Sequence, residues 1–324
     1  MIKKMIGRGF ATLAMLAVLA GAASAQGYPS RLIKFIHGFP PGGNIDIIAR
    51  LLANEMAKGL GQSIIVEPKV GTAGALAAEA VARSEPDGYT LLVLPSAHPA
   101  HGALAKTVNY KVVDDFDWIS VATFYPFLIC VRKDSPFKTL KELIDAARAS
   151  PGTLKYGSAG VGSILHTTVE LMASETKTKY LHIPYRGEIP AITGILQGDV
   201  DFIAVTTGPI SERVRAGEFR ALGVTSKARW RDFPDVPTVA EQGIAGFEVI
   251  SWTGLAGPAR MPAPVVERLN AELRRAIATQ DIKSKLEAMG GDARGTTPSE
   301  MRALVASQFA LWTKLAKDAN ISID

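Results

Sequence analysis

A glycine-rich turn between an apolar strand and an amphipathic helix sets the first constraint on this fold. The mostly apolar run Leu32–Ile36 predicts a buried strand, and the turn Phe39-Pro40-Pro41-Gly42-Gly43 follows it. Asn44 is then the expected N-cap of a helix, whose apolar residues share one face: Ile45, Ile48, Ala49, Leu52 and Met56. The first backbone N–H groups of a helix lack intrahelical partners and lie at the positive end of its dipole. This arrangement can hold an anion without a cationic side chain.

The same arrangement recurs near the middle of the chain, at Leu154–Ser163. A strand enters the run Gly157-Ser158-Ala159-Gly160-Val161-Gly162-Ser163, and a helix with an apolar face follows it. Glycine allows a backbone to approach a ligand closely, and Ser163 can cap the helix or donate to an anion. No Lys follows the glycines, and Leu165 occupies the third glycine position of the dinucleotide fingerprint. Nucleotide phosphate is therefore disfavoured, and a smaller anion remains open.

The first 25 residues have the pattern of a cleaved secretion signal. Lys3, Lys4 and Arg8 precede an apolar run from Phe10 to Leu19, and Ala23-Ser24-Ala25 matches the small-x-small cleavage pattern. The run is too short to span a membrane, which takes about 20 apolar residues. We therefore expect a periplasmic protein. Of the 36 Lys and Arg residues, three lie in this segment, so the mature chain carries 33 against 31 acidic residues. No basic stripe suggests a nucleic-acid partner.

Catalytic and metal-binding patterns are weak. Ser158 or Ser163 could be combined with His166 and Asp201 as a triad, but no G-x-S-x-G elbow supports a serine hydrolase. The five histidines form no H-E-x-x-H pattern, and chelation by His98 and His101 is the only metal alternative that we considered. We expect a non-catalytic protein with no metal and no other cofactor. Cys130 lies alone in an apolar run and is expected to be buried.

Strands and helices alternate along most of the chain, which predicts an α/β fold. Beyond the two loop regions, the expected strands are 63–66, 89–94, 118–123, 127–132, 200–205, 221–225 and 249–254. The expected helices are 75–83, 139–149, 190–196 with Pro190 at its first position, one that starts at Pro264, and one capped by Thr297 and Glu300. Pro95–His98 follows a buried strand, where open α/β sheets place ligand loops.

Six motifs, spread in order over nearly the whole mature chain, resemble those of the substrate-binding proteins of tripartite tricarboxylate transporters, also called Bug receptors. They are F-P-P-G-G-x-x-D-x-x-A-R from Phe39, P-D-G-Y-T-L from Pro86, Y-G-S-x-G-x-G-S-x-x-H from Tyr156, H-x-P-Y-R-G from His182, P-D-V-P-T-V-A-E-x-G from Pro234, and W-x-G-L-x-x-P from Trp252.

The resemblance implies a two-lobed periplasmic binding protein of a type II-like fold, with two crossing hinge strands and a ligand cleft between the lobes. Mapped onto this chain, lobe 1 comprises 26–125 and 253–324, and lobe 2 comprises 126–252. Such a receptor holds a small carboxylate or dicarboxylate between two loops, here Phe39–Asp46 and Gly157–Ser163, largely through backbone N–H groups and bridging waters. It then delivers the ligand to the membrane subunits of the transporter. We expect a monomer.

Three departures from the family pattern leave the ligand open. Relatives usually have Val-Pro where this chain has Ile36-His37-Gly38, a different run where it has Pro68–Gly74, and Asn-Pro where it has His98-Pro99. An aliphatic dicarboxylate, an aromatic acid, an amino acid and a nicotinate-like compound all remain open. So does a role as solute sensor for a membrane histidine kinase, which would use the same clamp.

The candidate ligand-binding residues lie in the two loops or at strand ends that would face the cleft. They are Phe39, Pro41, Gly42, Gly43, Asn44, Asp46, Ser96, His98, Ser158, Gly160, Val161, Gly162, Ser163, Tyr185, Thr206 and Thr207. For Asp46, contact with the ligand and interaction with N–H groups of its own helix both stay open. Arg186 is a candidate partner for a second carboxylate or a structural residue. We expect His166 to bond locally and Trp252 to be a core residue at the hinge.

Overall fold

The structure, a computed structural model, describes residues 27–323, so the expected signal segment lies outside the described residues. The strands are β1 Ile33–His37, β2 Ile64–Pro68, β3 Thr90–Pro95, β4 Phe116–Arg132, β5 Lys155–Ser158, β6 Leu181–Pro184, β7 Phe202–Thr206, β8 Phe219–Val224, β9 Ile250–Pro258 and β10 Asp292–Ala293. The helices are α2 Asn44–Leu60, α3 Ala75–Ala82, α4 Ala97–Leu104, α5 Leu140–Ala149, α6 Ile164–Thr176, α7 Glu188–Gln197, α8 Thr207–Arg215, α9 Ala263–Ala278, α10 Gln280–Ala288 and α11 Pro298–Asp318, with short 3-10 turns at Thr72–Gly74 and Ala240–Gln242.

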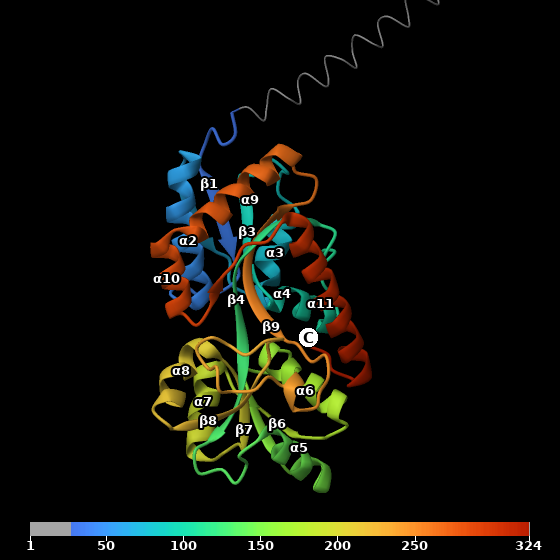
Figure 1. The fold of residues 1–324 in the computed structure, drawn as a ribbon. Helices are drawn as coiled ribbons and strands as arrows, with labels where there is room; N and C mark the ends of the chain where they lie inside the picture. Colours follow the sequence, from blue (N-terminus) through green and yellow to red (C-terminus); the bar gives the residue numbers. More distant parts are fainter. Residues whose placement is uncertain (1–26, 324) are drawn as a thin grey trace, which may run out of the picture.

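The strands form two lobes joined by β4 and β9 (Figure 1). We call the lobe built on β1, β2 and β3 the first lobe, and the lobe built on β5 to β8 the second lobe. The strand order along the sheet is β2-β1-β3-β9-β4-β7-β5-β6, and β8 and β10 also pair with β4. This arrangement confirms the two-lobed α/β fold with crossing strands, while the residue at which the lobes divide stays a prediction.

The prediction of two separate strands, 118–123 and 127–132, with a break at Tyr125-Pro126 between them, is wrong, because β4 is one strand of 17 residues. Its first part pairs with β9, as far as Pro126 opposite Ile250. From Phe127 on, it pairs with β7 and β8 instead. Proline has no N–H to donate, and it is tolerated here because the strand changes partners at this position. The connection between the lobes is therefore a continuous strand.

The strand directions place the expected loops on facing edges. The strands β1 and β3 are parallel, and β3 runs antiparallel to β9, which runs antiparallel to β4. In the second lobe β7 is antiparallel to β4, and β5 and β6 are parallel to β7. The carboxyl ends of β1 and β3 therefore point toward the second lobe, and those of β5, β6 and β7 point back toward the first.

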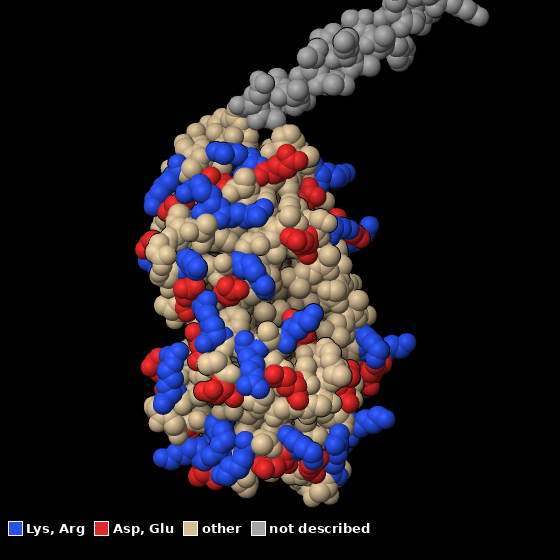
Figure 2. Space-filling model, in the orientation of Figure 1, with Lys and Arg blue, Asp and Glu red and all other residues tan. Residues whose placement is uncertain are grey.

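In each lobe, hydrophobic core residues lie on both faces of the sheet. One cluster also connects the lobes, because it contains Ala100, Leu104, Trp312 and Leu315 together with residues of α5 and α6. The last described residue, Ile323, extends this contact: its N–H donates to the carbonyl of Leu104 at 3.0 Å. The C-terminal helix α11 thus runs along one side of the first lobe, and its end reaches α6 of the second lobe (Figure 1). On the face shown in Figure 2, basic and acidic side chains are interspersed.

Several expected elements are confirmed, whereas the strands β6 and β10 and three helices were missed. The capping boxes of α5 and α11 are present, and Trp252 and Cys130 are fully buried. The short helices α4, α8 and α10 were not expected, and α7 begins at Glu188 rather than at Pro190. Within residues 27–323, no helix combines the length and apolar character needed to cross a bilayer.

Candidate functional site

The first glycine-rich loop connects β1 to α2. Gly43, and not Asn44 as expected, is the N-cap, and it provides no side chain to cap the helix. Gly42 has a positive φ of 76°, which glycine adopts without strain. Its N–H and that of Gly43 are already used, by Asp46 and by the carbonyl of Pro40. In the described part of the chain, the N–H groups of Asn44, Ile45 and Asp46 have no acceptor, so they are the groups of this loop that can bind an anion.

Asp46 fastens this loop to the helix. Its buried carboxylate accepts hydrogen bonds from the Gly42 N–H at 3.0 Å and from two nitrogens of Arg50, each at 2.9 Å. The Nε2 atom of the fully buried His37 lies 3.0 Å from the same carboxylate. These contacts, first of all the hydrogen bonds from Arg50, lower the pKa of Asp46 to about 2. Asp46 therefore positions the loop, and the N–H group that it accepts belongs to the loop and not to its own helix, while contact with the ligand stays a prediction.

The second glycine-rich loop connects β5 to α6. Ser163 caps α6, as expected, because its Oγ accepts a hydrogen bond from the His166 N–H at 3.2 Å. The Gly160 N–H donates to Ser158 Oγ at 3.1 Å, and the Gly162 N–H donates to His166 Nδ1, also at 3.1 Å. The loop is thus largely closed by its own hydrogen bonds. Val161 is its exposed tip.

Three stacked aromatic rings, of Tyr156, His182 and His166, lie next to this second loop. The rings of His166 and His182 lie 4.1 Å apart at an angle of 15°, and Tyr156 stacks on His182 at 4.7 Å. His182 Nε2 lies 2.6 Å from Ser158 Oγ. Burial lowers the pKa of both histidines to about 4, so they are neutral at pH 7 and can accept hydrogen bonds. The expectation that His166 bonds locally is confirmed.

The alternative of a serine triad is not supported by the geometry. Ser163 contacts the backbone of His166 and not its ring, and Asp201 accepts from the N–H of Lys155. Ser158 does approach a histidine ring, but the ring is that of His182, and the Ser158 side chain is buried. A buried hydroxyl cannot reach a substrate carbonyl, so this pair does not have the geometry of a nucleophile and its base.

A cavity of about 450 Å³ lies between the two lobes, beside the start of α2. This volume is within the range of small-molecule sites. The cavity brings together the predicted residues Asn44, Thr206 and Thr207. The residues that sequence reasoning missed are Ile47, Tyr125, Glu188, Ile189, Gly208, Pro209, Ala288 and Met289. The second loop is not among the described residues that line it.

Glu188 is the most informative of the residues that sequence reasoning missed. It is the first residue of α7, and its Oε1 and Oε2 accept hydrogen bonds from the N–H and the hydroxyl of Thr206, at 2.5 and 2.9 Å. Thr206 is the N-cap of α8, so one carboxylate links two helix starts. Burial raises the pKa of Glu188, and the hydrogen bonds from Thr206 oppose that rise. The acid directly after H-x-P-Y-R-G was the available signal in the sequence.

Thr207 and Arg231 form hydrogen bonds between the two lobes at one edge of the cleft. The Thr207 hydroxyl donates to the carbonyl of Gly290 at 2.9 Å, which joins the start of α8 to the first lobe. Arg231 bonds to Glu287 and to the carbonyl of Gly291 at 2.9 and 2.5 Å. The two lobes are therefore in direct contact next to the cavity.

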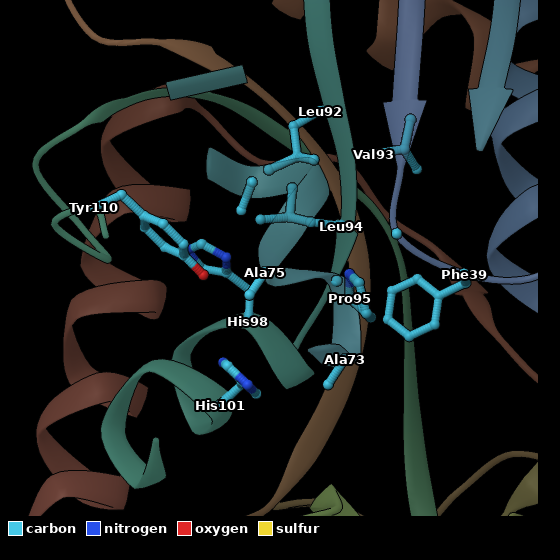
Figure 3. Close-up of a pocket in the computed structure, with 13 residues that line it drawn as sticks. Phe39, Ala73, Ala75, Leu92, Val93, Leu94, Pro95, His98, His101 and Tyr110 are labelled. Carbon is cyan, nitrogen blue, oxygen red and sulfur yellow. The ribbon is translucent and has the colours of Figure 1, made fainter. Parts of the chain in front are cut away.

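Phe39 and His98 lie elsewhere, around a cavity of only about 10 Å³ inside the first lobe (Figure 3). The expected ligand loop Pro95–His98 instead comprises the last residue of β3, the N-cap Ser96 and the first two residues of α4. His98 Nε2 lies 2.9 Å from the carbonyl oxygen of Val112, and the His98 ring stacks on Tyr110 at 5.6 Å. This cavity holds about one water molecule, so it has no room for an organic acid.

The remaining candidates are spread around the cleft. Ser96 is buried against the hinge strand β9, with its Oγ 2.8 Å from that of Ser251. The Tyr185 ring packs on α7 next to Gly194. Arg186 is exposed. None of these three residues lines the larger cavity in the described part of the chain.

Comparison with known proteins assigns the chain to a family. Residues 48–321 match the model of the tripartite tricarboxylate transporter family receptor. Protein BugT of Bordetella pertussis is 31% identical over 307 residues, which cover 94% of each chain. A protein of R. palustris solved with adipate is 31% identical, with a TM-score of 0.77 over 91% of this chain and 99% of the other.

A second solved structure is similar to this chain to the same degree. MatC from Rhodopseudomonas palustris, solved with bound malate, is 33% identical, with a TM-score of 0.74 over 89% of this chain and 99% of the other. The match of the family model, the identities and the fold agree over nearly the whole described chain. The chain is therefore a member of the tripartite tricarboxylate transporter receptor family, to which the Bug receptors belong.

Proposed function

We propose that this protein is a periplasmic receptor that binds a small organic carboxylate between its lobes and passes it to the membrane subunits of a tripartite tricarboxylate transporter. The observation that carries the proposal is the start of α2, where the N–H groups of Asn44, Ile45 and Asp46 have no acceptor in the described chain and Asn44 lines the cavity between the lobes. Relatives solved with adipate and malate support a carboxylate as the ligand.

Helix-start amides supply the binding energy in this proposal. Each hydrogen bond to a charged group contributes roughly 1.5–3 kcal/mol net. Three or four such bonds offset the loss of ligand freedom and leave roughly micromolar affinity. The second loop, at the facing edge of the other lobe, closes over the ligand and excludes water, which strengthens the same bonds. We assign no catalytic step to the protein.

A thermal-shift screen of carboxylic acids on the purified mature chain tests the proposal. A ligand that binds only the folded state raises the melting temperature in proportion to ln(1 + [L]/Kd). We expect the melting temperature to rise with the logarithm of concentration above Kd for at least one carboxylate, and not to rise with its amide. No shift with any organic acid would refute the receptor function.

Sensing through a membrane histidine kinase is the second candidate, because it would use the same clamp. Loss of uptake of the identified acid in a deletion strain supports transport. Unchanged uptake, with loss of ligand-induced gene expression, supports sensing.

A further inference from the structure

The cavity between the lobes contains one carboxylate and no basic side chain among its described lining residues. The carboxylate is that of Glu188. Asn44, at the start of α2, lines the same cavity, whose volume is about 450 Å³. An anion bound to the α2 amides and a group bound to Glu188 can therefore belong to one small molecule.

Glu188 is held in place but is not saturated. Each of its oxygens accepts one hydrogen bond from Thr206. An ionised carboxylate has about four acceptor positions, so both oxygens can accept a further bond. Because Glu188 begins α7 and Thr206 caps α8, the carboxylate has little freedom to turn away from the cavity.

The charge of Glu188 discriminates between ligand groups. A second ligand carboxylate at this place would bring two negative charges together in a cleft that closure shields from water, where repulsion is strong. An ammonium group would neutralise the half-buried Glu188 carboxylate and offer three N–H donors to it.

The rest of the lining is largely apolar. Five aliphatic or thioether side chains form the other wall and the rim: Ile47, Ile189, Pro209, Ala288 and Met289. Ile189 is 62% exposed, so it has apolar surface to bury when a ligand enters. This wall suits an uncharged side chain.

We propose that the ligand is a zwitterionic amino acid with an uncharged side chain, and that Glu188 is the residue that selects its ammonium group over a second carboxylate. The inference rests on the proposed function, because the α2 amides are taken to hold the ligand carboxylate.

Matched acids that differ only at the α-carbon substituent test this selection. One set has an ammonium group there (alanine, leucine, phenylalanine), one a hydrogen (propionate, isocaproate, hydrocinnamate), and one a carboxylate (methylmalonate, isobutylmalonate, benzylmalonate). Isothermal titration calorimetry measures each affinity at pH 7.5. We expect the amino acid of at least one skeleton to bind roughly tenfold or more tightly than its two counterparts.

The variant Glu188→Gln keeps the shape and the acceptor for the Thr206 N–H but removes the charge. We expect it to lower amino-acid affinity by roughly tenfold or more and to spare or improve binding of the plain and malonate acids. The matched control is Glu212→Gln, which changes an exposed acid on α8 of the same lobe. The control should leave the preference unchanged.

The outcomes separate this inference from the proposed function. If the wild type binds plain acids or malonates as well as amino acids, Glu188 does not select the ligand, while the receptor function stands. The same holds if Glu188→Gln lowers thermal stability but keeps the preference, which would give Glu188 a capping role only. If none of these nine acids binds but another carboxylate of the thermal-shift screen does, the amino-acid ligand is refuted and the receptor function stands. If no carboxylate binds in either experiment, the proposed function fails as well. The wild-type ranking remains decisive even if Glu188→Gln does not fold.

Discussion

The carboxylate of Asp46 accepts a hydrogen bond from the backbone N–H of Gly42 at 3.0 Å, so the helix fixes the shape of the loop that precedes it. The same carboxylate is bonded to Arg50 and lies next to His37. One buried side chain thus joins strand, loop and helix. The consequence is that the free N–H groups at the start of α2 keep one direction in the absence of a ligand, which lowers the entropy lost on binding.

Replacing Asp46 by Asn should therefore weaken both stability and binding. The amide has one acceptor oxygen in place of two and no charge, so the contacts with Gly42 and Arg50 cannot all persist. We expect a loss of about 2–3 kcal/mol in the free energy of unfolding, measured by urea titration. Asp281→Asn, at an exposed pair with Lys285, is the control and should change it by less than about 0.5 kcal/mol. A similar small effect for both variants would contradict the role given to Asp46.

Acid should destabilise the protein at pH values above those at which its carboxylates titrate. Burial lowers the pKa of His98 to about 4, compared with the ordinary histidine value of 6.5. Between these values the unfolded chain binds the proton and the folded chain does not. The stability is therefore complete above about pH 6.5 and falls as the pH drops toward 4, by up to roughly 3 kcal/mol for this residue. His166 and His182 act in the same direction.

Melting curves between pH 7.5 and pH 4.5 measure this loss. The variant His98→Phe keeps an aromatic ring among Tyr110, Phe116 and Trp118 but removes the titrating group. We expect it to be less stable than the wild type at pH 7.5, because the bond to Val112 is lost, and to have a flatter pH profile. Parallel profiles would mean that His98 does not titrate in this range.

Gly162 should be intolerant of alanine for two separate reasons. Its φ is +76°, and a Cβ atom there would lie 2.5 Å from Cγ2 of Ile323. Gly217 has a similar φ of +72° but open space around it. We expect Gly217→Ala to cost about 1 kcal/mol of stability from strain alone, and Gly162→Ala to cost about 1 kcal/mol more.

The double variant Gly162→Ala with Ile323→Ala isolates the contact. Removal of the isoleucine methyl groups should relieve the clash, so the double variant should lose less stability than the sum of the two single variants. Strict additivity, measured by chemical unfolding, would show that Ile323 does not press on the second loop.

Local sequence signals predicted the parts of this fold that local physics determines. The apolar spacing of Ile45, Ile48 and Leu52 was enough to predict α2, and Thr297 with Glu300 was enough to predict the start of α11. The helices α4, α8 and α10 have only eight or nine residues each, which is too short for a clear period. Pro126 suggested a break because the sequence does not show that β4 changes partners there.

Of the residues that line the cavity, the sequence predicted Asn44, Thr206 and Thr207 and missed the other eight, while the role of the two glycine-rich loops stays a prediction. Glycines and a helix start indicate an anion site from adjacent residues alone. The hydrogen-bond partner of Glu188 is Thr206, which lies 18 residues further along the chain. Tyr125 lines the cavity from the hinge strand β4. The capture of the Gly42 N–H by Asp46 also depends on the folded loop geometry. Contacts of this kind come from tertiary structure, which spacing along the chain does not encode.

The most direct test of the anion site is to remove a single N–H at Asn44. Proline is well tolerated at the first position of a helix, which Asn44 occupies, and it lacks the N–H. The preceding Gly43 has an extended ψ of 167°, which a following proline favours. Asn44→Pro should therefore leave α2 and the melting temperature nearly unchanged. Asn44→Ala, the matched control, loses the same side chain but keeps the N–H.

If the amide holds the ligand carboxylate, Asn44→Pro should bind the best acid from the screen roughly 10- to 100-fold more weakly than Asn44→Ala does. The difference between the two variants reports the N–H alone, because both lack the amide side chain. Calorimetric titration of both proteins provides the comparison. Equal affinities would place the carboxylate away from the start of α2, since one charge-assisted hydrogen bond cannot be lost there without a measurable change in Kd.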